Sequence, residues 1–198
     1  MRTMPSARDT FRLSDLIEGR VRVRLFKRQP GATYVMGPPE EPHVIEDVAL
    51  DWESPEGDLN AKAVNATLVL SGLFKDPSER AVRHLAVGTG PGSYNPADPP
   101  DIVTNEILTA ELFRAPILFT NYVNGSGDPV LTKTNTVDLV FRFDFGEAVG
   151  TLEEMGLFGG SESVGRNTGL ITNYKVFTPF VKASDRIMYV TWRIRFNI

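Results

Sequence analysis

The stretch IMYVTWRIRFNI, residues 187–198, alternates between apolar and polar side chains along its whole length. One set of alternate positions is apolar: Met188, Val190, Trp192, Ile194, Phe196 and Ile198. The positions between them are mostly polar: Tyr189, Thr191, Arg193, Arg195 and Asn197. Successive side chains of a β-strand point to opposite faces of its sheet, so the pattern predicts a strand with one buried and one polar face.

The same period of two occurs in residues 134–145 and again nearer the N-terminus. In the first segment one side is apolar and rich in aromatic residues: Val137, Leu139, Phe141, Phe143 and Phe145. In the second, Arg20, Arg22 and Arg24 alternate with Val21, Val23 and Leu25. We therefore expect three long strands with their apolar sides in the core.

Weaker patterns predict the remaining elements. Strands are expected at residues 43–52, 63–74, 117–123 and 171–181, and residues 80–87 fit either a strand or one helical turn. Residues 101–114 show the clearest helical period, with Asp101 as N-cap and Pro116 as the stop. Glycine and proline predict loops at residues 28–42 and 88–100. Strands separated by turns, without βαβ alternation, predict an antiparallel β-sandwich or open barrel with one short helix.

We expect a single domain, residues 20–198, behind an N-terminal segment of residues 1–19. This segment is polar with scattered apolar positions, and Phe11, Leu13 and Leu16 with Ile17 fit one amphipathic turn that ends at Gly19. An extended arm fits the same residues equally well. A chain of 198 residues is long enough to bury a sizeable core.

The composition argues against several classes of protein. The chain has no cysteine, which rules out disulfides, thiolate nucleophiles and zinc–thiolate sites. A net charge of −4 argues against a binder of nucleic-acid backbones, and no apolar run is long enough to span a membrane. The N-terminus lacks the apolar core of a signal peptide, so we expect a protein that stays in the cytosol or leaves by lysis.

The loop Gly88-Thr-Gly-Pro-Gly92 invites comparison with phosphate-binding motifs but differs from them in detail. A dinucleotide fingerprint needs Gly or Ala where Ser93 stands, and a P-loop needs a Gly-Lys-Ser/Thr sequence. Pro91 also removes one of the amides that would bind a phosphate. We interpret the segment as a loop with positive φ angles.

Histidines and carboxylates show no catalytic or metal-binding spacing. His43 and His84 lie far apart in the chain, and no Gly-x-Ser-x-Gly elbow is present. The acidic pairs are Glu40-Glu41, Glu46-Asp47 and Glu153-Glu154. Neighbours on a strand point to opposite faces, so we interpret these pairs as solvated edge charges rather than as the facing carboxylates of a glycosidase. We predict no catalytic residue, no metal ligand and no cofactor.

Arginines and tyrosines are the remaining candidate contact residues. The arginines at 20, 22, 24, 193 and 195 lack the interleaved aromatic residues that stack on nucleic-acid bases. We interpret them as a salt-bridge face between subunits or as a solvent-exposed face. Three tyrosines lie in segments predicted to be at the surface: Tyr34, Tyr94 and Tyr122. Tyrosine at such a position serves as an interface residue or is merely exposed.

Residues 85–198 carry an ordered set of short motifs that resembles a family of small virion structural proteins of tailed bacteriophages. The motifs are Val87-Gly-Thr-Gly90, the loop of residues 96–101, Asn105-Glu106 with Leu108 and Leu112, Glu154-Met-Gly-Leu-Phe158, Phe177-Thr-Pro179 with Lys182, and Thr191-Trp-Arg-Ile-Arg-Phe196. Residues 1–84 look like an addition to this pattern, as a second sheet layer or an assembly arm.

The resemblance implies a non-enzymatic structural subunit on the exterior of a tailed-phage virion. As a capsid decoration protein or a tail, neck or fibre-attachment component, it would be made in the host cytoplasm and assemble with copies of itself and with other virion proteins. Two alternatives stay open. One is a carbohydrate- or receptor-binding module of the phage tail, whose partner is a host surface glycan. The other is an enzyme that acts on the host envelope through Glu153 and Glu154.

Overall fold

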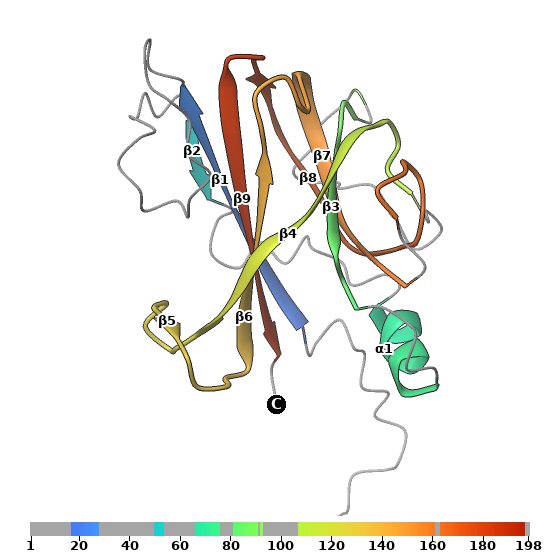
Figure 1. The fold of residues 1–198 in the computed structure, drawn as a ribbon, viewed down its shortest axis with the longest axis vertical. Helices are drawn as coiled ribbons and strands as arrows, with labels where there is room; N and C mark the ends of the chain where they lie inside the picture. The colour runs from blue at the N-terminus through green and yellow to red at the C-terminus, as the bar shows by residue number, and fades with distance from the viewer. Residues whose placement is uncertain are drawn as a thin grey trace, which may run out of the picture.

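The computed structural model describes residues 17–27, 50–53, 66–75, 81–90, 92, 107–160 and 163–196. Within these residues the fold is mainly β, with one short helix (Figure 1). The strands are β1 (Ile17–Lys27), β2 (Leu50–Glu53), β3 (His84–Gly88), β4 (Glu111–Val123), β5 (Pro129–Val130), β6 (Thr136–Phe143), β7 (Gly150–Gly159), β8 (Leu170–Lys182) and β9 (Arg186–Phe196). The helix is α1 (Ala66–Lys75).

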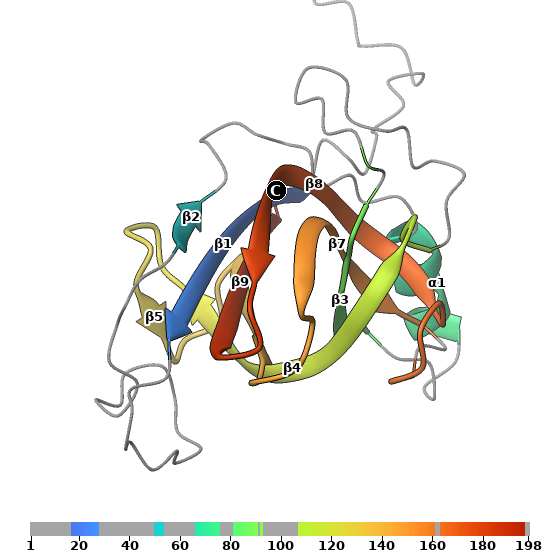
Figure 2. The ribbon, with the colours of Figure 1, turned by 90° about the horizontal axis from the view of Figure 1, so that it is seen from above.

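The described strands form one antiparallel sheet that curls into a half-barrel. Its order is β2-β1-β9-β6-β4-β3-β7-β8, and β5 pairs with the end of β4. Seen from above, the strands make an arch (Figure 2). The expected mainly β, antiparallel fold with one short helix is confirmed, in its open-barrel form.

Strand β4 joins the two halves of this sheet. Its N-terminal half pairs with β3, and from Ile117 onward it pairs with β6. Pro116 lies at the changeover, next to an irregularity between Ile117 and Phe119. Proline donates no backbone hydrogen bond, so it suits the point at which one partner strand replaces another.

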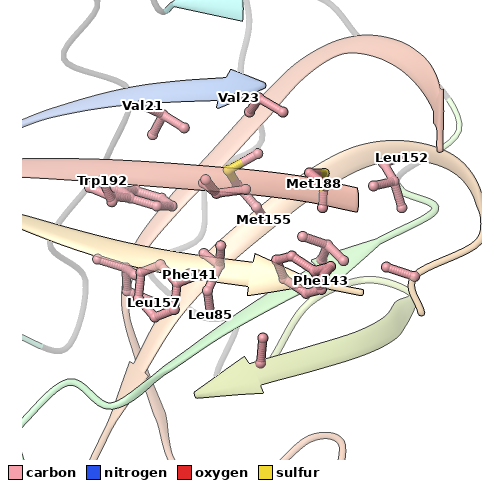
Figure 3. Close-up of a cluster of buried hydrophobic side chains, with 14 of the residues drawn as sticks. Val21, Val23, Leu85, Phe141, Phe143, Leu152, Met155, Leu157, Met188 and Trp192 are labelled. Carbon is pink, nitrogen blue, oxygen red and sulfur yellow. The ribbon is translucent and has the colours of Figure 1, made fainter. Parts of the chain in front are cut away.

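The main apolar core lies between the two halves of the sheet (Figure 3). Trp192 and Met188 of β9 meet Phe141 and Phe143 of β6 there, and Leu157 comes from β7. The alternation that predicted β6 and β9 therefore places the expected faces inward. Smaller clusters cover the outer faces: Ala86, Leu108, Phe158, Ile171, Tyr174 and Val176 on one half, and Phe26, Val140, Ile187 and Tyr189 on the other.

Two predicted elements are wrong. Residues 66–74 of the expected strand 63–74 belong to helix α1, which lies against β8 and in which Val69 is buried. Its three leucines, together with Ala66 and Lys75, favour a helix. The expected helix 101–114 is not one in its described part, because residues 107–110 are irregular and β4 begins at Glu111. Pairing with β3 overrides the helical period there.

Three boundaries also change. Strand β1 starts at Ile17, three residues before the expected strand, and residues 1–16 lie outside the described residues. The expected strand at 43–52 is described only from Leu50. Residues 84–88 form a strand rather than a helical turn.

Strand β7 was not predicted, because Glu153, Glu154 and Gly156 interrupt its alternation of apolar and polar residues.

Candidate functional site

The glycine turn after β3 allows two segments to approach closely. Gly90 and Gly92 have φ angles of +96° and +72°, which confirms the predicted positive φ angles. A Cβ at Gly88 would lie 2.5 Å from Oε1 of Glu154 and 2.6 Å from the carbonyl oxygen of Ala110. The backbone N–H of Thr89 donates to that same carbonyl at 3.0 Å. The described part of this turn therefore acts as a packing contact.

Glu154 is a buried anchor, and its interpretation as a solvated edge charge is wrong. Its side chain is fully buried and accepts hydrogen bonds from the backbone N–H groups of Thr109 at 3.0 Å and Ala110 at 2.7 Å. The Tyr174 hydroxyl donates a third, at 2.8 Å. Burial, and then the charge of Glu154, raises the pKa of Tyr174 well above its ordinary value. With both oxygens engaged, Glu154 has no accessible carboxylate to share with Glu153.

A buried ion pair in β4, Glu111 with Arg114, binds the segment of residues 163–168. A bulge at the start of β4 turns Glu111 to the same side as Arg114, and the two side chains form a bidentate pair at 2.9 and 2.8 Å. Both side chains are fully buried. Arg114 also donates to the carbonyl of Thr168 at 2.7 Å, and its guanidinium stacks over the Phe158 ring at 4.1 Å.

The ammonium group of Lys182 ties two turns together. Its Nζ donates to the carbonyl oxygens of Asp144 at 2.9 Å, Glu147 at 2.6 Å and Arg186 at 2.9 Å, and the residue is fully buried. Burial lowers the pKa of Lys182 to about 8, while the charges of Glu147, Asp144 and Asp185 act in the opposite direction. This contact fastens the turn between β6 and β7 to the turn between β8 and β9.

The histidines and tyrosines considered above give no assembled centre in the described residues. His84 is buried in β3, and Tyr122 is half-buried in β4. Within the described ranges no group of three or more histidines and carboxylates could hold a metal ion. His43, Tyr34, Tyr94 and the acidic pairs at 40–41 and 46–47 lie outside those ranges.

The arginines lie together on the outer face of β1 and β9. Backbone register sets Arg22 opposite Glu53, Arg24 opposite Asp51, and Arg195 opposite Glu18. Arg193 forms a bidentate pair with Asp138 of β6, at 2.7 and 2.9 Å. Arg193 is thus paired within the chain, although backbone register also places it opposite another arginine, Arg20.

A polar cleft of about 600 Å³ opens at one end of this face. Arg20, Arg193 and Arg195 line one side, and the turn of residues 124–127 with residues 134–136 lines the other. Its lining offers amide, hydroxyl and guanidinium groups, which are hydrogen-bonding partners of a polar ligand.

An apolar groove of about 550 Å³ follows the N-terminal half of β4. Its apolar lining includes Phe113, Ile117, Leu118 and Val164. Its charged lining residues are Arg114, Arg142, Asp144, Glu147 and Arg166. Leu118 is 45% exposed and Val164 is 76% exposed. Sequence reasoning missed this groove, because it depends on where β4 leaves β6.

The buried anchors were missed as well. In the sequence they resemble ordinary charged residues: Glu111, Arg114, Glu154 and Lys182. The only signal was that Glu154 and Lys182 belong to the ordered motifs.

No protein-family model, no curated protein and no solved structure matches the chain. Among the described residues, no helix is both long and apolar enough to cross a membrane.

Proposed function

We propose that the chain is a non-enzymatic structural subunit on the exterior of a tailed-phage virion. The observation that carries this proposal is the location of the motifs that resemble the phage family. Residues 154–158 are all buried in β7, and Phe177 and Trp192 are buried in the core. These motif residues therefore hold the scaffold together, and a common scaffold is what a family of building blocks needs.

The anchoring of the fold also suits a repeated building block. The segments around residues 107–110 and 163–168 are fastened by buried carboxylates, Glu154 and Glu111, without any disulfide. A subunit present in many copies gains from such rigidity, because symmetry multiplies each weak contact between copies. Exposed apolar side chains at Leu118, Val164 and Val181 offer contact area.

Mass spectrometry of purified particles tests the proposal. Particles banded on a density gradient should contain the chain in a constant ratio to the major capsid protein. A chain present in the lysate but absent from banded particles would overturn it. Copy number then separates the locations, because decoration of a capsid needs many copies and a tail or neck component needs few.

The polar cleft favours a second candidate, a receptor-binding module that recognises a host surface glycan. Arg195 is exposed at this cleft, and Arg20 and Arg193 line it with the amide and hydroxyl groups. A glycan array probed with the chain should then give a signal that is lost in the variant Arg195→Ala. An array without signal above background would count against this candidate and leave the structural role in place.

A further inference from the structure

Along the apolar groove, the N-terminal half of β4 has one edge with which no described strand pairs. One side of this half pairs with β3, and the N–H of Ile117 donates to the carbonyl of Arg83 on that side at 2.8 Å. Alternate residues of a strand direct their backbone groups to opposite sides, so the N–H and C=O of Arg114 and the C=O of Pro116 point to the other side. In the described part of the chain, no strand pairs with that side.

The groove has the features that an added strand requires. Open backbone groups at its floor supply hydrogen bonds, and apolar walls receive alternate side chains. Leu118 and Val164 are the exposed apolar residues of these walls. The Phe113 and Phe143 rings close the core beneath, with ring centroids 6.1 Å apart. An incoming strand would therefore pack on the outside of a core that is already closed by these two rings.

We propose that residues 10–14 of one copy occupy this groove in a neighbouring copy. The segment reads Thr-Phe-Arg-Leu-Ser, with apolar side chains at alternate positions Phe11 and Leu13. That period of two matches an extended strand that presents one apolar face. Residues 10–14 lie three to seven positions before Ile17, the first residue of β1, so the segment is tethered to the start of that strand.

Register shows why the segment binds a neighbour and not its own chain. Ile17 lies opposite Phe196, whereas Ile117, at the near end of the groove, is level with Phe141 and Val190. Val190 and Phe196 are six residue steps apart, which is roughly 20 Å along the sheet. Leu13 is four residues from Ile17 and reaches at most about 14 Å from it. The groove of its own copy is therefore out of reach of Leu13, and the proposed partner is the groove of another copy.

The resulting contact is head-to-tail. Each copy gives its segment to one neighbour and receives a segment from another, which generates a ring or a filament. In the proposed structural subunit, this would be the contact between copies of the chain. Its biological role rests on that proposed function. It is tested on the purified chain, so its failure and the failure of the virion proposal are distinguishable.

Disulfide trapping tests the contact directly, because the natural chain has no cysteine. Two full-length single-cysteine variants, Phe11→Cys and Leu118→Cys, are mixed and oxidised. The heterodimer should form in about tenfold higher yield than with Leu131→Cys as the second protein, because an interface holds its cysteines at high effective concentration. Leu131 is the matched control, since it is fully exposed beyond the other end of β4. Equal yields with both partners would overturn the proposal.

Sedimentation of variants without cysteine gives an independent result. Val164→Lys and the double variant Phe11→Ser with Leu13→Ser should each weaken self-association by about tenfold to a hundredfold, as expected for loss of one or two buried apolar side chains. Leu131→Lys should leave it unchanged. A wild-type chain that stays monomeric at all soluble concentrations, or equal weakening by Leu131→Lys, contradicts the proposal.

Discussion

The two halves of the half-barrel bury their strands in different ways. In β1 and β9, inward apolar residues alternate with arginines and polar residues that remain partly exposed, as Val21 and Arg22 illustrate. In β3 all five residues are buried, and in β7 and β8 long runs are buried on both faces. The first half thus has one covered face over much of its length, and the second half has two.

This difference decides what stabilises each half. A strand with a solvated face can place its charges in water, whereas a strand covered on both faces must satisfy every polar group inside the protein. The second half does so through Glu154 and through the pair of Glu111 and Arg114. We therefore expect charged residues to be critical in the second half and nearly dispensable in the first.

The largest effect is expected for Glu111→Ala. The change leaves the guanidinium of Arg114 buried without its carboxylate, which should lower the free energy of unfolding by about 3–5 kcal/mol. Urea denaturation followed by circular dichroism measures the loss. Replacing Glu111 and Arg114 together by Leu and Met should recover much of it, and a double variant as unstable as the single one would contradict this account.

Gly88→Ala should have the next largest effect. Its Cβ would meet Glu154 and the carbonyl of Ala110 at contacts too short to be tolerated, so the segment around residues 107–110 must shift. We expect a loss of about 1–3 kcal/mol in the free energy of unfolding. Gly125→Ala is the matched control, because nothing lies within 4 Å of its added Cβ. Equal melting temperatures for the two variants would exclude a close-approach role for Gly88.

The pH dependence of stability should reveal Lys182. Its pKa is about 8 in the folded chain and 10.5 when unperturbed, so between these pH values the unfolded chain retains a proton that the folded chain has released. The contribution of this group to the free energy of unfolding therefore rises as the pH increases from 8 to 10.5. The difference between wild type and Lys182→Met should show this rise. A difference that is flat or falls across this range contradicts the shift.

The smallest effect is expected in the first half, at the pair of Asp138 and Arg193. Arg193 keeps 32% of its side chain exposed. Asp138→Ala should lower the free energy of unfolding by about 1 kcal/mol or less, and added salt should reduce the difference further. A loss as large as that of Glu111→Ala would remove the distinction between the two halves.

The same contrast explains what the sequence can reveal. Alternation in residues 137–143 and 187–196 predicted β6 and β9, because a half-buried strand shows its two faces directly. Burial on both faces hides β7, whose Glu154 and Gly156 resemble loop residues. The spacing of the apolar residues near Leu108 resembles that of a helix. Leu108 instead packs on the outer face of β7 and β8.

The candidate sites were even less visible in the sequence. The groove exists because β4 pairs with β3 before Pro116 and with β6 after it. Such a change of partner strand leaves no periodic pattern of apolar residues in the sequence. Buried charges such as Lys182 resemble surface lysines until the carbonyl groups around them are known. The φ angles of Gly90 and Gly92, in contrast, followed from composition alone, because glycine is the residue that adopts them at no cost.

A cryo-electron microscopy map of the intact particle shows most directly whether the chain is a repeated structural subunit. We expect half-barrels repeated by the symmetry of the capsid or tail, each with an additional strand from a neighbouring copy along the N-terminal half of β4. A particle without such half-barrels would contradict the proposed structural function. Half-barrels whose β4 edges carry no additional strand would contradict the head-to-tail contact.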